Sequence, residues 1–513
     1  MWTRKTIALV LTFMLVACGR SDNSLSPVAT GTAKTHHGPG GGGILHIARL
    51  ESFDGWKLDS AASYASYQTD AAVMEPLLRF AADGVHVLPG LAEKWDYDVD
   101  LHTWTFTLRD NAKFSNGQPV TAADVVFSFG VWLKGVNFGP SFAHMKKAVA
   151  LDPRRVQFVL DAPDDTTPSR LSGSIAGVMP RDFAGLTETE FYKKPIGAGP
   201  FTVEKWSSGG RIELARNKYY YATDRPYFDQ IVVDVVPDSN ELTILFQGGQ
   251  ADIVEYVSTS SAAQYAPGSL IVTPKGQIYH LSLNAKKAPY SDPAVRRSIA
   301  AAIDYNAIAK GVLQGYGTAP TGILPPNLAN WAPPSSPYYT TDVGEAKRLL
   351  ATSRGARGFP AELIYDSGNS TDGLIAQVIQ SNLAKIGIAV KLTGLEELAF
   401  LDRAYSLNAD MIVWNYGPIS PDISDPLDWI AGTHYLFTGA DDTLFLKHLA
   451  SYASSRDSAV KHTAVVAIQD DARNQAAAIA LAEFPTIHAV APRLRGFDPA
   501  PWGLYYWDTI RRE

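Results

Sequence analysis

Hydrophobic and polar residues alternate most regularly around residues 103–108. Trp104, Phe106 and Leu108 alternate there with three threonines. A period of two, with β-branched and aromatic side chains, is typical of a strand that buries one face. This segment therefore predicts a half-buried β-strand.

The residues that follow change from this period of two to a helical one. Asn116-Gly117 predicts a tight turn, because this dipeptide accepts the positive φ that such turns need. Thr121 and Asp124 have the spacing of a helix cap, with a hydroxyl for a free N–H and an acid near the positive helix end. Hydrophobic residues recur behind the cap at helical spacing, at Val125, Phe129 and Trp132.

The rest of the chain shows both periods in turn, which indicates an α/β protein. Short strands are expected at 44–48, 201–206, 211–215 and 281–284. The last of these is predicted to be an edge strand, and a helix is predicted within 61–80, with Val73, Leu77 and Phe80 on one face. A strand, a helix and a second strand are predicted at 363–365, 374–386 and 388–392, which is the repeating unit of α/β domains.

Composition limits the classes of function. A chain of 513 residues has room for two or three domains, and 46% hydrophobic with 19% charged residues is ordinary for a soluble globular protein. The net charge of −7 argues against a nucleic-acid partner. The sequence has no nucleophile elbow, no H-E-x-x-H and no Walker A motif, and its histidines are scattered. We therefore predict no enzymatic activity, no catalytic residues, no cofactor and no metal site.

The single cysteine, Cys18, follows a short positive region and an apolar run that is too short to span a bilayer. Residues 15–18, Leu-Val-Ala-Cys, resemble the lipobox of bacterial lipoproteins, in which the cysteine carries lipid and becomes the mature N-terminus. The resemblance implies a signal peptide at 1–18. An uncleaved anchor and a plain secretory signal are the alternatives, and both also place the protein outside the cytoplasm.

Residues 19–43 are polar and then glycine-rich, and we predict a flexible tether there. The segment contains a formal G-x-G-x-x-G match at Gly38, Gly40 and Gly43. Because no strand precedes the match and no βαβ unit surrounds it, a phosphate-binding loop is the weaker interpretation.

Several blocks have the order and spacing of one known family. They are Pro-Gly-Leu-Ala-Glu-Lys-Trp at 89–95, Trp-Thr-Phe-Thr-Leu-Arg at 104–109, Lys-Phe-Ser-Asn-Gly-Gln-Pro-Val-Thr-Ala-Ala-Asp-Val-Val-Phe-Ser at 113–128, Pro-Ile-Gly-Ala-Gly-Pro-Phe at 195–201, and the stretch from Leu281-Ser-Leu-Asn to Ala-Ile-Asp-Tyr305. These blocks resemble the signature of the family 5 extracellular solute-binding proteins, the oligopeptide-, dipeptide- and nickel-binding components of ABC importers. The resemblance extends over about residues 44–507.

The resemblance implies an α/β fold of two lobes, of the type II periplasmic-binding-protein kind, with an additional inserted domain. The implied boundaries are lobe I at 44–75, 195–285 and 485–513, the inserted domain at 76–194, and lobe II at 286–484.

The resemblance also implies a binding site near the segment 410–426. Peptide-binding relatives have Trp and then Asp-x-x-Asp-Pro there, and the first Asp holds the ligand's α-ammonium. By motif that residue is Asp422, and Trp414, Asn415 and Tyr416 are further candidates. The stretch between Trp414 and Asp422 is longer than the family pattern, so a turn-capping role for Asp422 and a core position for Trp414 remain open.

Three aromatic residues are candidates from other parts of the chain. Tyr64 and Tyr67 stand at the start of a predicted helix, and in the family the segment before this helix borders the ligand cleft. Phe142 stands where peptide-binding members often place an aromatic side chain facing the ligand. Surface positions for the two tyrosines are equally compatible with the sequence.

The function implied is capture of oligopeptides or dipeptides between two lobes, for delivery to the permease and ATPase subunits of an ABC importer. The protein is expected to be a monomeric lipoprotein, anchored through Cys18 in the periplasm or at the cell surface. Two alternatives remain. One is a non-peptide solute for the same kind of transporter, such as a sugar, an opine-like compound or a nickel chelate. The other is a non-transport role as a peptide-sensing or chaperone-like lipoprotein or a hydrolase.

Overall fold

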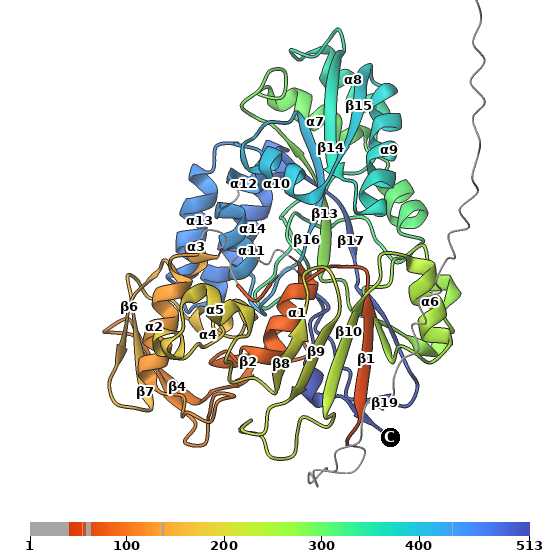
Figure 1. The fold of residues 1–513 in the computed structure, drawn as a ribbon. Coiled ribbons are helices and arrows are strands. Elements are labelled where there is room, and N and C mark those ends of the chain that lie inside the picture. Colours follow the sequence, from red (N-terminus) through yellow and green to blue (C-terminus); the bar gives the residue numbers. More distant parts are fainter. Residues whose placement is uncertain (1–40, 54, 58–62, 136–137, 433) are drawn as a thin grey trace, which may run out of the picture. The chain divides into compact units, whose positions relative to one another are not determined.

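Three sheets organise the part of the chain that the computed structural model describes, residues 41–53, 55–57, 63–135, 138–432 and 434–513 (Figure 1). Helices pack against these sheets, and the mixed α/β fold class predicted from the sequence is confirmed. The predicted signal peptide, the lipidation site Cys18 and the tether up to residue 40 lie outside the described residues.

The first sheet has seven strands in the order β12-β18-β11-β1-β10-β9-β8. Its inner strand β1 runs parallel to both of its neighbours, β10 and β11. We call the part of the chain built on this sheet lobe I. Its elements are β1 (Ile44–Arg49), α1 (Tyr64–Val73), β8 (Phe201–Trp206), β9 (Ile212–Arg216), β10 (Gln230–Val235), α6 (Ser239–Gln247), β11 (Ile253–Glu255), β12 (Leu270–Val272) and β18 (Ile487–Val490).

The second sheet has five strands in the order β15-β14-β16-β13-β17, and we call the part built on it lobe II. The predicted strand–helix–strand unit is confirmed as β14, α9 and β15, with the two strands parallel and in register over their whole length. The strands are β13 (Gln277–Leu283), β14 (Phe359–Asp366), β15 (Ile388–Leu395), β16 (Met411–Tyr416) and β17 (Ala478–Phe484). The helices are α7 (Pro293–Ala302), α8 (Val343–Ala351), α9 (Ser370–Ala384), α10 (Glu397–Tyr405), α11 (Ser424–Gly432), α12 (His434–Phe437), α13 (Thr443–Ala453) and α14 (Ser458–Gln475).

The position of β13 differs from the prediction in two ways. The segment was expected to be an edge strand, but β13 pairs with β16 on one side and β17 on the other, and all seven of its residues are buried. Near-continuous burial is typical of a strand covered on both faces. The strand also falls within the range 195–285 predicted for lobe I, although its sheet is that of lobe II.

The third sheet, β4-β5-β7-β6, belongs to the region between α1 and β8, which we call the inserted region. Its strand β5 confirms the predicted alternation, since Trp104, Phe106 and Leu108 are buried. The predicted cap is present as well, because the Thr121 N–H donates to Asp124 Oδ2 at 2.8 Å and α2 begins at the next residue. The elements are β2 (Leu78–Phe80), β3 (Val87–Pro89), β4 (Ala92–Asp98), β5 (Thr103–Leu108), α2 (Ala122–Trp132), α3 (Gly139–Phe142), β6 (Met145–Ala150), β7 (Arg155–Leu160), α4 (Thr167–Arg170) and α5 (Glu188–Lys193).

Helix α1 is shorter than predicted. It begins after Ser63, whose side chain accepts a hydrogen bond from the Ser66 N–H, and it ends at Val73. Pro76 follows closely, and a proline both lacks the N–H that a helix needs and restricts the residue before it. Residues 78–80 therefore form the strand β2 instead of continuing the helix.

Two crossovers connect the sheets of the lobes, residues 273–276 between β12 and β13 and residues 485–486 between β17 and β18. They are bonded to each other. The Thr273 N–H donates to the Thr486 carbonyl at 3.1 Å, and the Thr486 N–H donates to Thr273 Oγ1 at 3.0 Å. The chain thus passes between the lobes twice at one place.

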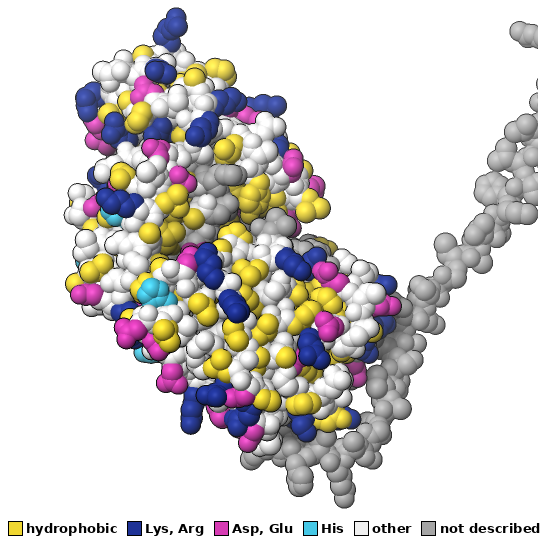
Figure 2. Space-filling model, turned by 90° about the vertical axis from the view of Figure 1, so that its left-hand side faces the viewer, with side chains coloured by type: hydrophobic (Ala, Val, Ile, Leu, Met, Phe, Trp, Pro, Cys, Tyr) yellow, Lys and Arg dark blue, Asp and Glu magenta, His cyan; other side chains and the backbone are white. Residues whose placement is uncertain are grey.

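The surface has the ordinary appearance of a folded protein in contact with water. In Figure 2 hydrophobic side chains are interspersed with charged ones on the face shown. The exposed hydrophobic residues of the inserted region include Leu88 and Leu101. Scattered apolar side chains of this kind are normal. Among the described residues, no helix combines the length and the apolar character needed to cross a membrane.

Candidate ligand site

The loop that leaves β16 of lobe II comes into contact with α1 of lobe I. The Tyr64 hydroxyl donates to the Pro418 carbonyl at 3.1 Å. A Cβ atom on Gly417 would lie 2.1 Å from that hydroxyl, so only glycine allows this approach. The contact joins residues 354 positions apart in the sequence.

The peptide group between Pro418 and Ile419 is held from both sides. Its carbonyl accepts from Tyr64, and its N–H donates to Asp425 Oδ2 at 2.7 Å. Asp425 lies in the first turn of α11. This carboxylate therefore fixes the loop that meets lobe I.

Aromatic rings surround this contact. The Tyr64 and Tyr67 rings meet edge to face with centroids 6.0 Å apart, and Tyr416 stacks on Trp429 at 4.7 Å. Burial raises the pKa of Tyr64, Tyr67 and Tyr416 well above the usual range, and the Asp425 carboxylate adds to the shift in all three. The tyrosines therefore remain neutral hydroxyl donors at physiological pH.

Asp425 itself is half-buried and has an unusual pKa. Burial raises it to about 7, against the opposing effect of the Ile419 N–H and with a further contribution from Asp428. Within the described residues no Lys, Arg or His forms an ion pair with Asp425, because the cations of this interface are paired elsewhere.

Asp422, three residues earlier, is in a different environment from Asp425, because only 6% of its surface is exposed. Tyr452 donates to its two oxygens at 2.8 and 2.9 Å, Asn330 Nδ2 donates to Oδ2 at 2.8 Å, and the Ser424 N–H donates to Oδ1 at 2.8 Å. All of these donors are neutral. Both oxygens of Asp422 are thus occupied by protein groups.

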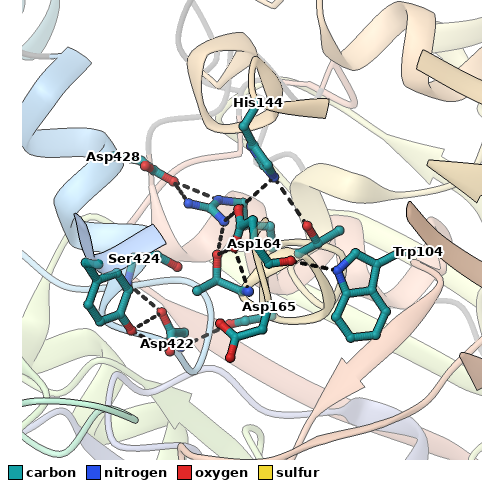
Figure 3. A network of polar contacts seen from close by, with 12 residues as sticks. Trp104, His144, Asp164, Asp165, Asp422, Ser424 and Asp428 are labelled. Carbon is teal, nitrogen blue, oxygen red and sulfur yellow. Dashed lines mark hydrogen bonds and ion pairs between the residues drawn. The ribbon is translucent and has the colours of Figure 1, made fainter. Parts of the chain in front are cut away.

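Next to Asp422 the inserted region is bonded to lobe II through α4 (Figure 3). Arg170 pairs with Asp164 at 2.9 Å and with Asp428 at 2.7 Å. Burial alone would lower the pKa of Arg170, but the two carboxylates outweigh it and hold the guanidinium charged. Burial raises the pKa of Asp428 to about 6, although Arg170 opposes that shift.

Two further contacts complete this interface. The Asp422 N–H donates to Ser169 Oγ at 3.0 Å, and Lys461 of α14 pairs with Asp165. His144 lies 3.2 Å from Asp164, and burial together with Arg170 lowers its pKa to about 3, so the imidazole is neutral. The interface therefore contains buried ion pairs as well as neutral hydrogen bonds.

Comparison with known proteins identifies the family of this chain. The family model for bacterial extracellular solute-binding proteins, family 5 Middle, matches residues 86–435. The chain belongs to this family of solute-binding proteins.

Individual relatives are similar over most of their length. The dipeptide-binding protein of Escherichia coli K12 is 25% identical over 485 residues, which is 85% of this chain and 88% of the relative. The structure of DppA from Helicobacter pylori in complex with the peptide STSA has a TM-score of 0.82 at 23% identity, covering 92% of this chain and 98% of the other. AgaA from A. tumefaciens R10, in complex with agropinic acid, has a TM-score of 0.81 at 25% identity, with 92% and 99% covered.

The structure of this solute-binding protein brings three of the predicted site residues together, Tyr64, Tyr67 and Tyr416. Asn415 is half-buried and pairs with Tyr279 in the sheet. Trp414 lies in the core of lobe II, where it donates to Ser282 Oγ at 2.8 Å and stacks on His280.

Phe142 packs against the inserted region's own helix α2. It is 1% exposed and packs on Trp132 of α2, with centroids 5.4 Å apart. Its ring is therefore a core element of the inserted region in this structure.

Sequence reasoning missed the residues that bind Asp422 and Asp428. Arg170, Ser169, Asn330 and Tyr452 come from segments far apart in the chain and carry no local motif. Asp428 is the one member of this network that the sequence could have indicated. It follows Asp425 by three residues, a spacing that places the two side chains close together on one helix.

Proposed function

We propose that this solute-binding protein captures short peptides between its two lobes and presents them to the permease of an ABC importer. The observation that carries the proposal is the contact of Tyr64 with the loop 417–419, where tyrosines and a half-buried carboxylate from both lobes meet. The names of the relatives support the peptide class, since several are dipeptide- or oligopeptide-binding proteins.

The mechanism follows from the position of this contact. A ligand that touches both lobes binds the closed form better than the open form, and so shifts the population toward closure. The crossovers at 273–276 and 485–486 are the natural hinge for this movement, because domain hinges are short connecting segments. Transport energy would come from the importer's own ATPase subunits.

The predicted lipid anchor at Cys18, the periplasmic or cell-surface location and the monomeric state are part of this proposal. So is the assignment of Tyr64, Tyr67 and Tyr416 to the ligand site. Labelling of cells with a fatty-acid analogue, with a Cys18→Ser control, tests the anchor: wild-type protein should carry the label and the variant should not.

A second candidate is a non-peptide solute carried by the same kind of importer. The similarity to AgaA, whose structure was determined with agropinic acid, supports this second candidate. Native mass spectrometry of the protein purified without Cys18 distinguishes the two candidates. A ladder of heterogeneous peptide masses supports the peptide class, whereas one non-peptide mass supports the alternative and contradicts the peptide proposal.

A further inference from the structure

A loop near the C-terminus, residues 500–504, lies against both crossovers between the lobes. Thr273 Oγ1, in the first crossover, donates to the Pro501 carbonyl at 3.0 Å and accepts from the Thr486 N–H of the second crossover at 3.0 Å. We call residues 500–504 the C-terminal loop. One buried hydroxyl therefore joins both crossovers to this loop.

The approach of the C-terminal loop to the crossovers is close enough to require glycine on both sides. A Cβ atom on Gly276, in the first crossover, would lie 2.5 Å from the carbonyl carbon and oxygen of Pro501. A Cβ atom on Gly503 would lie 2.7 Å from Thr486 Oγ1, and the φ of +100° at Gly503 is one that other residues rarely adopt. The crossovers therefore have no free space on the side that faces the loop.

The C-terminal loop is itself held in place. The Gly503 N–H donates to the Ala500 carbonyl at 2.8 Å, which closes the loop on itself. The next side of the support is α1 of lobe I. The Tyr505 N–H donates to Gln68 Oε1 at 3.0 Å, and Gln68 Nε2 donates to the Tyr505 carbonyl at 2.6 Å. Because Gln68 and Tyr505 are both buried, water does not compete for these bonds, and the loop is a fixed part of lobe I.

A second side chain connects the C-terminal loop to lobe II. Gln277, the first residue of β13, donates from Nε2 to the Trp502 carbonyl at 3.2 Å. The Gln277 side chain also lies beside Gly417, since a Cβ atom on Gly417 would be 2.8 Å from Gln277 Cγ. Gly417 belongs to the loop that meets Tyr64 of lobe I. One buried residue therefore touches both the support of the hinge and the contact between the lobes.

We propose that the C-terminal loop is a clamp on the hinge, and that Thr273 is the positioning residue through which it acts. The bonds of Thr273 and Gln277 are made in a structure whose lobes are in contact, so they favour the closed form. Their loss shifts the population toward the open form. This inference rests on the proposed function for its consequence, because a population that is more open binds a ligand between the lobes more weakly.

The test measures the distance between the lobes without any ligand. The chain has a single cysteine, Cys18, so the protein purified without it accepts two spin labels at chosen sites. Ser208→Cys in the turn after β8 and Leu398→Cys in α10 are exposed positions for them, read by pulsed electron paramagnetic resonance. Thr273→Val keeps the shape of the side chain but removes the hydroxyl. It should increase the ratio of long to short distances by about 2- to 10-fold, the effect of one lost hydrogen bond.

Three further variants control this result. Thr273→Ser keeps the hydroxyl and should retain the wild-type distances. Thr243→Val, in α6, also removes a buried hydroxyl that donates to a backbone carbonyl, that of Ser239 at 3.0 Å, and should leave the distances unchanged. Gln277→Met removes the other bond to the C-terminal loop and should shift the distances in the same direction as Thr273→Val. It also covers the case in which Thr273→Val does not fold.

The contrary outcomes are distinct. Wild-type distances in Thr273→Val would overturn the clamp even if the variant unfolded more easily, because its role would then be structural alone. An equal shift in Thr243→Val would overturn it as well. Addition of a casein digest tests the proposed function separately, since bound peptides should move the wild type toward shorter distances. If the digest changes nothing in the wild type, the peptide proposal fails, while the comparison without ligand still decides the clamp.

Discussion

Two of the contacts that lobe II makes with the rest of the chain have opposite character. Toward the inserted region it presents buried ion pairs, Arg170 with Asp428 and Lys461 with Asp165. Toward α1 it presents one neutral hydrogen bond, from Tyr64 to the Pro418 carbonyl, among aromatic rings.

The difference indicates which contact is structural and which is exchangeable. Breaking a buried ion pair leaves a charge without a partner in a poorly solvated place, which is costly. A neutral hydrogen bond at a half-buried site contributes little net free energy, because water or a ligand can replace it. We therefore expect the charged contact to govern stability and the neutral contact to govern ligand exchange.

The largest expected effect comes from Arg170→Ala. The change leaves Asp164 and Asp428 buried without their cation, and the free energy of unfolding should fall by about 3–5 kcal/mol. Chemical denaturation measures it. The control is Arg403→Ala, which breaks the more exposed pair with Glu362 and should cost only about 0–1 kcal/mol. Equal losses in the two variants would show that the Arg170 contact is not structural.

The second-largest expected effect is a change in how the free energy of unfolding depends on pH. The pKa of Asp425 is raised to about 7 in the folded state, so the folded protein binds more protons than the unfolded chain. Its contribution is fully present below the unfolded pKa near 4 and is lost as the pH rises through 7. In Asp425→Asn, the decline in unfolding free energy between pH 4 and 8 should be smaller by about 3 kcal/mol, after discounting for partial exposure. Parallel pH profiles for wild type and variant would exclude a buried, uncompensated Asp425.

Gly417→Ala should have a smaller effect on stability. Its Cβ would lie 2.1 Å from the Tyr64 hydroxyl, and such overpacking should cost about 1–3 kcal/mol. Adding Tyr64→Phe removes the clashing oxygen and should recover part of the loss. Gly130→Ala, in α2 with open space around it, is the control and should not destabilise. Strictly additive losses in the double variant would contradict the proposed approach of Tyr64 to the loop.

The smallest effect is expected for Tyr64→Phe by itself. Loss of one neutral hydrogen bond should lower the unfolding free energy by about 0.5–1.5 kcal/mol. Tyr67→Phe is the matched control, since no hydrogen bond of its hydroxyl is found among the described residues. If both variants melt at the wild-type temperature, the hydroxyl of Tyr64 contributes nothing to closure in the absence of ligand.

Local patterns predicted local structure well. The alternation at Trp104 and Phe106 and the cap at Thr121 are set by neighbouring residues, and both were confirmed. The end of α1 at Val73 was missed because hydrophobic residues continue at helical spacing up to Phe80, although Pro76 interrupts the backbone.

Features that depend on distant partners could not be derived in this way. A buried strand such as β13 looks like an edge strand when the sequence does not show that β16 and β17 flank it. The motif predicted that Asp422 is important, but only its contacts with Asn330 and Tyr452 show that its oxygens are occupied. Arg170 has no sequence signal at all, since its partners lie in different segments of the chain.

The paired crossovers have a consequence for how this architecture can be built and altered. β12 and β18 are antiparallel neighbours with Val272 opposite Ile487, and the whole of lobe II lies between them in the sequence. In topological terms lobe II is an insertion into a β-hairpin. The two segments that connect it to lobe I lie side by side and are hydrogen-bonded to each other. Joining residue 272 to residue 487 through a short turn would therefore leave the seven-stranded sheet unbroken. In its connections lobe II is thus a separate module, which the chain enters and leaves at one place.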